Sequence, residues 1–306
     1  DKGMAALAGL KELRSLDLTH VKITGAGLKP LADLKNLRRL YLAGIEFNPK
    51  DLAPLSELTH LEYLQLLSPK WVKIDITPLA AMRRLRELHL VRTGITGPSL
   101  KNLSELTQLR KMSFSGSKLT ARGLKHVAKL KNLRSLALVH TKIATAGLRH
   151  LSSLKNLRQL HLGGTNFHDT GLKHLTGLKK LRILDLARTS ISNAAMKHLS
   201  SLRNLRRLNL EGTKATDNGL RHLATLTALV ELNLRQTGVN DAGLAHLSRL
   251  ANLQALALIR TQITDAGLKH LFGLSKLRVV YLFVTKVTDK GARELQKHLP
   301  DCRIER

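Results

Sequence analysis

Leucine recurs along this chain with a fixed period of 24 residues, from Leu13 to Leu277 without an insertion or deletion. Twelve repeats of 24 residues therefore fill residues 13–300. Residues 1–12 match the second half of a repeat, because Asp1-Lys2-Gly3 corresponds to Asp289-Lys290-Gly291. Residues 301–306 match the beginning of one and predict a short strand at the C-terminal end. The unbroken register predicts a single repeat domain over residues 1–306.

Each repeat contains two hydrophobic patterns, as Leu253 to Lys276 illustrates. Leucines at repeat positions 4 and 6 are two residues apart, which predicts a short strand with one buried face. Leucines at positions 16, 19 and 22 are three residues apart, which predicts a short helix or 3₁₀ segment with one buried stripe. Between them, Thr264, Asp265 and Gly267 supply a capping side chain and a residue without a Cβ. Such a unit buries a core only when it stacks on its neighbours.

These repeated L-x-x-L-x-L segments resemble the leucine-rich repeat family over the whole chain. The resemblance implies an α/β fold, a right-handed solenoid in the form of a horseshoe. One parallel sheet of about twelve strands would line its concave face, and short helices or 3₁₀ turns its convex face. The form Thr-x-Ile-Thr-Asp-x-Gly-Leu is similar to repeats common in bacterial, notably planctomycete-type, proteins. Many family members carry asparagine at position 9, where eight of these repeats carry threonine, so a full amide ladder is not expected.

The first repeats depart from this pattern. Position 18 is proline at Pro30, Pro54 and Pro78, whereas the repeats from His126 to His270 carry histidine there. We therefore expect more 3₁₀ or extended backbone in this N-terminal part of the chain. Trp71, the only tryptophan, stands near the usual isoleucine position, and we interpret it as a core residue.

The strand pattern also predicts the side chains on the concave face. Positions 3, 5 and 7 point away from the core because positions 4 and 6 point into it. Near the C-terminal end these positions form an apolar patch, which we predict to bind a partner: Ala255, Ala257, Ile259, Val279, Tyr281 and Phe283. In the middle of the chain they are polar and charged, and we predict a second set of partner contacts: Gln159, His161, Asp185, Arg207, Glu211 and Arg235.

Positive charge changes the picture, because 51 lysines and arginines outnumber 22 acidic residues and give a formal net charge of +29. Position 2 is arginine in nine repeats, so stacking would form a ladder along one rim that attracts anions. Its central members are Arg134, Arg158, Arg182 and Arg206. Nucleic acid or an acidic surface polymer would suit this ladder. Alternatively, repeat duplication has copied a solvated arginine whose stem covers core leucines. Aromatic residues are absent from the ladder, which disfavours base stacking.

Few residues suggest chemistry. The single cysteine, Cys302, excludes an internal disulfide and any multi-cysteine zinc site, and we expect it to be a small buried residue. No apolar run is long enough for a transmembrane helix. Histidines repeated every 24 residues are too far apart to share one metal ion. His161 and Asp185 fall on neighbouring strands, but no serine adjoins them as a nucleophile.

We therefore predict a protein–protein interaction module that is not an enzyme and uses no cofactor, metal or small-molecule substrate. An anion-binding scaffold is the first alternative, with a polyanion as partner, and an architectural spacer is the second. Because the chain begins in the middle of a repeat, its first core layer would face water. We expect upstream sequence or a second molecule to cover that end.

Overall fold

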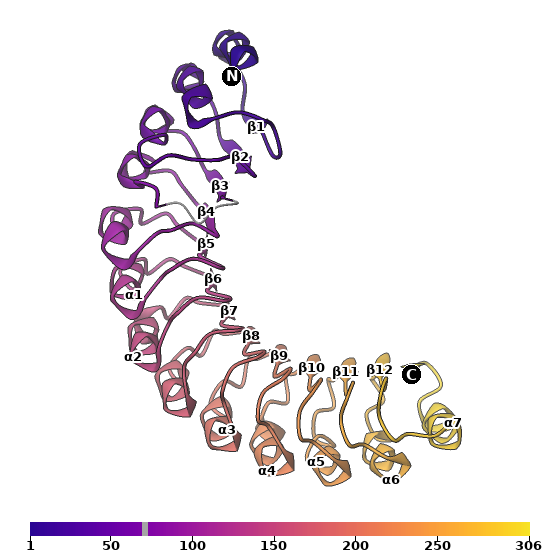
Figure 1. The fold of residues 1–306 in the computed structure, drawn as a ribbon. Coiled ribbons are helices and arrows are strands. Elements are labelled where there is room, and N and C mark those ends of the chain that lie inside the picture. Colours follow the sequence, from indigo (N-terminus) through magenta and orange to yellow (C-terminus); the bar gives the residue numbers. More distant parts are fainter. Residues whose placement is uncertain (69–72) are drawn as a thin grey trace. The chain divides into compact units, whose positions relative to one another are not determined.

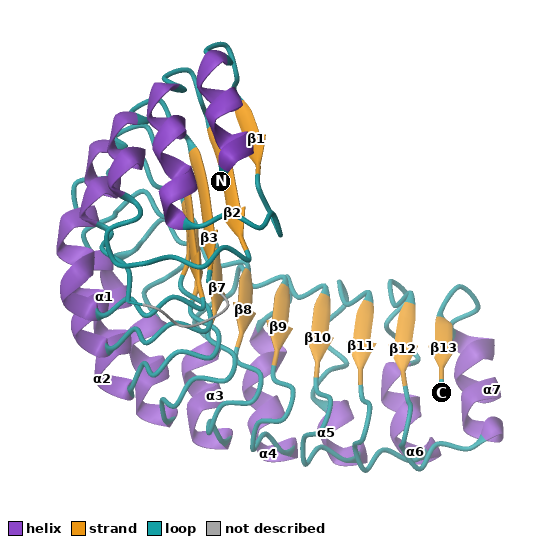
Figure 2. Ribbon diagram, turned by 45° about the horizontal axis from the view of Figure 1, so that its top comes forward, coloured by secondary structure: helices purple, strands orange, loops and turns teal. Residues whose placement is uncertain are grey.

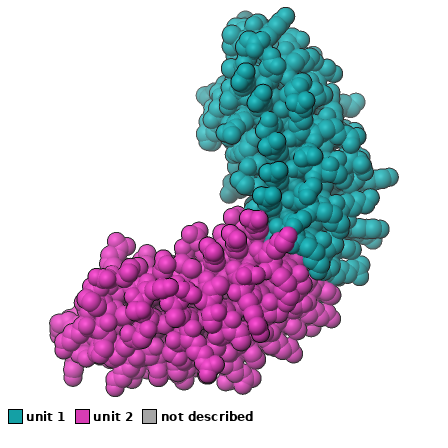
Figure 3. Space-filling model, turned by 180° about the vertical axis from the view of Figure 1, so that it is seen from behind, with its two compact units in different colours: residues 1–157 teal, residues 158–306 magenta. Residues whose placement is uncertain are grey.

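The computed structural model describes residues 1–68 and 73–306, so the interpretation of Trp71 concerns a residue outside the described part of the chain. The chain divides into two compact units, unit 1 over residues 1–157 and unit 2 over residues 158–306 (Figure 3). Each unit is a stack of repeats, in which one strand and one helical segment alternate (Figure 1). The single domain expected from the sequence register stays a prediction.

The strands of each unit pair in parallel and in sequence order. Paired residues are 24 positions apart, as in Leu232 with Leu256 and Ala257 with Tyr281. In unit 1 the strands are β1 (Ser15–Asp17), β2 (Arg39–Ala43), β3 (Tyr63–Leu67), β4 (Glu87–Val91), β5 (Lys111–Ser113) and β6 (Ser135–Ala137). In unit 2 they are β7 (Gln159–His161), β8 (Ile183–Asp185), β9 (Arg207–Asn209), β10 (Glu231–Asn233), β11 (Ala255–Ala257), β12 (Val279–Tyr281) and β13 (Arg303–Glu305). The last of these is the predicted C-terminal strand.

Short helical segments connect the strands and cover one face of each sheet, as Figure 2 shows for unit 2. In unit 1 they are the 3₁₀ segments η1 (Lys2–Gly9), η2 (Gly25–Asp33), η3 (Ala53–Glu57), η4 (Thr77–Ala81), η5 (Gly97–Leu103) and η6 (Arg149–Ser153), with the α-helices α1 (Ala121–Val127) and α2 (Thr145–Leu148). In unit 2 they are η7 (Asp169–Leu175), η8 (Arg221–Thr225) and η9 (Lys269–Leu271), with α3 (Asn193–Leu199), α4 (Asp217–Leu220), α5 (Asp241–Ala245), α6 (Asp265–Leu268) and α7 (Asp289–His298). The first four repeats thus use 3₁₀ turns, where proline removes a backbone donor.

The core of each unit is a continuous column of leucines between strands and helical segments. From Leu18 to Leu282, every described side chain at positions 4 and 6 is buried, including the substitutes Met112, Phe114 and Val280. At the N-terminal end Leu16 is only half-buried and Leu10 is 50% exposed. The predicted fold, a solenoid with a parallel sheet on one side and short helical turns on the other, is confirmed within each unit.

Besides the backbone hydrogen bonds between paired strands, two ladders of side-chain hydrogen bonds link consecutive repeats. In the aspartate ladder, a side-chain oxygen at position 13 accepts a hydrogen bond from the backbone N–H 23 residues later: Asp1, Asp169, Asn193, Asp217, Asp241 and Asp265. In the asparagine ladder, an amide at position 24 donates to the carbonyl 25 residues earlier: Asn36, Asn132, Asn156, Asn204 and Asn252. The threonines at position 9 act locally instead, since Thr237 Oγ1 donates to Leu234 O at 2.6 Å within its own repeat.

Candidate functional site

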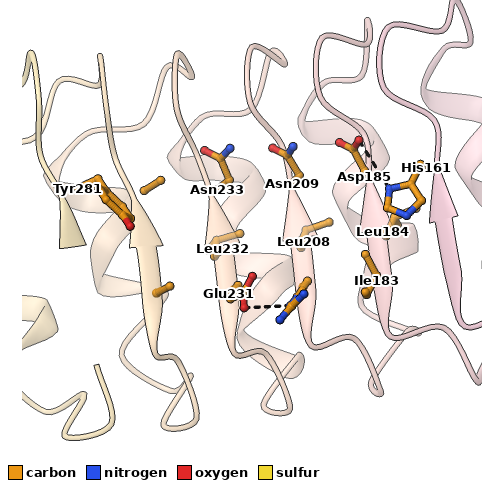
Figure 4. Close-up of a pocket in the computed structure, with 13 residues that line it drawn as sticks. His161, Ile183, Leu184, Asp185, Leu208, Asn209, Glu231, Leu232, Asn233 and Tyr281 are labelled. Atoms are coloured by element: carbon orange, nitrogen blue, oxygen red, sulfur yellow. Dashed lines mark ion pairs between the residues drawn. The ribbon is translucent and has the colours of Figure 1, made fainter. Parts of the chain in front are cut away.

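The exposed side of the sheet in unit 2, which we call the open face, carries positions 3 and 5 of each repeat and lies opposite the helical segments. It is hollowed over strands β7 to β12, with a cavity volume of about 490 Å³ (Figure 4). Six predicted partner-binding residues line this hollow: His161, Asp185, Arg207, Ala255, Ala257 and Tyr281. The polar and apolar sets, which the sequence predicted separately, therefore lie at one site in the structure. Both sets contribute because the strands stand side by side in register.

The upper edge of the hollow is formed by Asp185, Asn209 and Asn233, which occupy position 5 of three neighbouring strands (Figure 4). In each, Oδ1 accepts a hydrogen bond of 2.9–3.0 Å from the backbone N–H two residues later. This bond fixes the side chain at the end of its strand. The second oxygen of Asp185 and the Nδ2 groups of both asparagines remain on the open face. The edge therefore carries one acceptor and two amide groups at strand spacing, and the amide of Asn233 also donates to Glu211.

A charged network lies beside this edge and is centred on Glu211, whose side chain is only 17% exposed. Glu211 accepts hydrogen bonds from Arg188 Nη2 at 3.2 Å and from Asn233 Nδ2 at 3.3 Å. Arg235 Nε lies 3.8 Å from the same carboxylate and has no hydrogen-bond partner of its own. These contacts hold three cationic and polar groups in fixed positions, which reduces the entropy lost on binding. Glu211 and Arg235, both predicted as partner contacts, thus flank the hollow rather than line it.

The remaining charged pair lies at the opposite edge of the hollow. Arg207 Nε contacts Glu231 Oε1 at 2.9 Å, and both side chains are about half exposed, at 57% and 44%. An exposed pair of this kind adds little stability, because water screens both charges. The pair places a donor and an acceptor side by side at this edge. His161 Nδ1 lies 4.0 Å from Asp185 Oδ2, beyond hydrogen-bond distance, so the structure does not join them into a dyad.

Apolar side chains occupy both ends of the hollow. Ala255, Ala257 and Tyr281 form one end, on β11 and β12, where the small alanines leave the face recessed beside the tyrosine ring. Ile183 lies near the other end on β8, next to His161 of β7, and it was not predicted because the surrounding side chains at positions 3 and 5 are polar. The signal was present, since an isoleucine at position 3 is an apolar residue at an outward position.

The rest of the predicted apolar patch lies outside the hollow. Val279 and Ile259 are half-buried on the same face, whereas Phe283 is 40% exposed. Val284, which follows it, is 72% exposed and has φ of +58°, a backbone region that β-branched residues rarely adopt. Two large apolar side chains therefore face solvent next to the hollow, one of them on a strained backbone. Gln159, at position 3 of β7, is half-buried and does not line the hollow.

The arginine ladder lies at the start of the strands. Within the described residues, its four central members are exposed and have no acidic partner within ion-pair distance: Arg134 in unit 1, and Arg158, Arg182 and Arg206 in unit 2. Their backbone groups link the repeats instead, since Arg158 O accepts from Arg182 N at 2.8 Å and from Ile183 N at 3.0 Å. Anion binding by this ladder stays a prediction.

The open face of unit 1 carries a row of rings. Tyr41 and Tyr63 have ring centroids 4.7 Å apart, and His89 follows at 5.3 Å from Tyr63. Burial raises the pKa of Tyr63 and lowers the pKa of His89, so both rings are neutral at pH 7. Tyr63 donates to Gln65 at 2.8 Å, which fixes the middle ring. This row is packed, in contrast to the recessed face of unit 2.

The described residues contain no group of three or more histidine, cysteine or acidic side chains placed to hold a metal ion. In the same part of the chain, no helix has the length and apolar character needed to cross a membrane. Cys302 is a free, buried thiol, and burial raises its pKa.

Comparison with known proteins shows which sequences and structures these repeats are similar to. A sequence model of the leucine-rich repeat region family matches residues 1–242 and residues 132–303. Among solved structures, an internalin (inlF) of Listeria monocytogenes superposes with a TM-score of 0.76 at 23% identity, over 98% of this chain and 82% of that one. A leucine-rich-repeat protein of Leptospira interrogans gives a TM-score of 0.57 at 20% identity, over 98% and 91%.

A plant peptide hormone receptor in complex with RGF2 gives a TM-score of 0.54 at 13% identity, covering 98% of this chain and 60% of the receptor chain. At these identities the likeness concerns the fold. A search of curated proteins found no match.

Proposed function

Because this chain belongs to the leucine-rich repeat family, whose members are generally protein-interaction modules, we propose that the open face of unit 2 binds a partner protein. The observation that carries the proposal is the hollow of about 490 Å³, in which apolar ends and polar edges converge on one recessed surface. A recess with apolar ends and a few fixed polar groups suits the side chain of a partner residue better than a flat charged surface does. Among the similar structures, the plant peptide hormone receptor is described in complex with RGF2, which agrees with such a use of the fold.

The chemistry of the hollow describes the partner segment that would fit. Ile183 and Tyr281 favour apolar or aromatic side chains at the two ends. The asparagine amides and Arg207 donate hydrogen bonds, whereas Asp185 and Glu231 accept them. A partner segment with backbone carbonyls along the asparagine edge and a cationic side chain near Glu231 would satisfy both. Phe283 and Val284 extend the apolar contact beyond the hollow.

The interaction is proposed to be non-catalytic. Asp185 uses one oxygen on the backbone N–H of Ala187 and lies 4.0 Å from His161, so neither group has the contact that would make His161 a general base. The serine, threonine or cysteine nucleophile that such a base would activate is missing from the residues that line the hollow.

The test is a double variant, Tyr281→Ser with Phe283→Ser, compared with the wild-type chain for capture of proteins from an extract of the cells that make it. We expect capture of a specific protein to fall at least tenfold, because two aromatic anchors are removed. Phe272→Ser is the matched control. It removes an aromatic ring from the helical side of the same unit, where Phe272 stacks on His298 with centroids 3.7 Å apart. Equal capture by the folded double variant and the wild type would contradict the proposal.

A further inference from the structure

A second hollow lies on the helical side of unit 1, away from the open face. It has a cavity volume of about 420 Å³ and lies against η5, α1 and η6. Six of its eight lining residues are basic: Lys101, Arg122, Lys125, His126, Arg149 and His150. The other two are Pro98 and Ala121. No acidic side chain lines it among the described residues.

The positive charge in this hollow is not neutralised by the protein. Lys101, Arg122, Lys125 and Arg149 are exposed, and none is ion-paired within the described residues. The positive charge of these side chains contributes to the lowered pKa values of two histidines in the hollow. Burial, followed by Lys129, Lys125 and Lys101, lowers the pKa of His126. Burial, followed by Arg149 and Lys125, lowers the pKa of His150. His126 Nδ1 is inaccessible and has no hydrogen-bond partner.

The aspartate ladder explains why the charge collects here. Position 13 is acidic at Asp217, Asp241 and Asp265 in unit 2, but it is Gly97, Ala121 and Thr145 in the three repeats around the hollow. Position 13 therefore supplies no carboxylate to offset the cations at positions 14 and 17 in these repeats.

The missing side chain also brings the helical segments close together. The backbones of η5 and α1 approach so closely that a Cβ on Gly97 would lie 2.6 Å from Gly123 N. This approach sets the lysine of one repeat beside the lysine or arginine of the next.

We propose that this hollow binds a compact anion carrying two or more phosphate groups, either as a free oligophosphate or as a segment of a linear polyphosphate chain. Four permanent cations around a recess of this volume match several phosphate charges at once, and lysine and arginine donate charge-assisted hydrogen bonds to phosphate oxygens. The lining contains no aromatic side chain on which a base could stack, so a nucleic acid strand is disfavoured. The site lies in unit 1 and on the helical side, so it does not rest on the protein-binding proposal for unit 2.

The experiment measures the binding of inorganic tripolyphosphate to the full chain by calorimetry at pH 7. The variant Lys125→Gln with Arg149→Gln removes two cations from the hollow. The control Lys197→Gln with Arg221→Gln removes the same residue types from the same repeat position in unit 2, where Asp217 and Asp241 supply negative charge. We expect the hollow variant to weaken binding at least about tenfold and the control less than about twofold, because two charge-assisted contacts are lost only in the first. Circular dichroism verifies that both variants fold.

Equal weakening by the two variants would overturn the proposal, since it would show attraction to overall charge rather than a site. Absence of tripolyphosphate binding to the wild type would overturn it as well, as would equally tight binding of sulfate at the same ionic strength. A parallel titration with long-chain polyphosphate separates the two sources of ligand. A similar affinity per bound site indicates the free anion, whereas a much tighter, chain-length-dependent affinity indicates the polymer.

Discussion

The aspartate ladder predicts a measurable coupling between consecutive repeats. Asp241 Oδ1 accepts a hydrogen bond from Thr264 N at 2.8 Å, and Oδ2 accepts one from Thr264 Oγ1 at 2.6 Å. Hydrogen bonds to a charged group contribute about 1.5–3 kcal/mol each, and half-burial of both residues places this pair toward the lower value. We therefore expect Asp241→Ala to lower the free energy of unfolding by about 2–3 kcal/mol.

A double-variant cycle isolates the bond between the two side chains. Thr264→Val removes only the hydroxyl, which also caps α6 by accepting from Ala266 N at 3.2 Å, and we expect it to cost about 1–2 kcal/mol. The double variant should lose about 1 kcal/mol less than the sum of the single losses, because the shared bond is counted twice. Chemical denaturation gives the free energies. Hydrogen exchange of the Thr264 amide gives the local effect, about tenfold for each 1.36 kcal/mol.

Asp33→Ala, at an exposed carboxylate on η2, controls for the loss of negative charge alone and should change the free energy of unfolding by less than about 0.5 kcal/mol. Strict additivity of the two variants, or unchanged exchange of the Thr264 amide in Asp241→Ala, would refute the assignment of this ladder as a link between repeats.

Three further predictions follow from packing and charge. Leu162→Ala should lower the free energy of unfolding by about 2–5 kcal/mol in chemical denaturation, because Leu162 is fully buried; a loss below about 1 kcal/mol would show that the register is misread. The hydrogen bonds from Thr288 lower the pKa of Asp265. Their stabilising contribution should therefore be present above pH 3.8 and be lost as the pH falls below that value. Asp265→Asn should reduce this part of the pH dependence of the melting temperature. If the arginine ladder binds polyanions, replacing its four central arginines by glutamine should weaken heparin binding and flatten its salt dependence. These arginines are Arg134, Arg158, Arg182 and Arg206. An unchanged salt slope would show that they are only solvated residues.

The strands and their order could be predicted from the sequence because each repeat reports the same pattern. A leucine pair at positions 4 and 6 defines one buried face, and the 24-residue period defines which residues pair. The aspartate ladder was harder to foresee. The sequence indicated Asp265 only as a residue near a helix start, whereas its partner, Thr288, lies one repeat later. A local pattern does not show a contact that depends on how two repeats stack.

The candidate sites could be predicted only in part, for the same reason. Alternation along the strands correctly placed Tyr281 and Ala257 on the open face. It did not show that the alanines leave a recess, or that Ile183 lies at its far end, because a recess depends on the relative size of side chains on several strands. The basic hollow depends on residues that are missing, namely acidic side chains at position 13 beside Lys101 and Lys125. The excess of positive charge was visible in the composition, but not where it is left without a counter-charge.

The most direct test of the proposed function is photo-crosslinking from the hollow itself. A benzophenone amino acid would replace Ala257, which lines the hollow of unit 2, and in a second chain Lys269, which lies on the helical side of the same unit. After irradiation in a native extract, mass spectrometry would identify the proteins that are joined to each chain. We expect a partner protein to be crosslinked from position 257 and not from position 269. Crosslinking of the same partner from position 269 alone would contradict it.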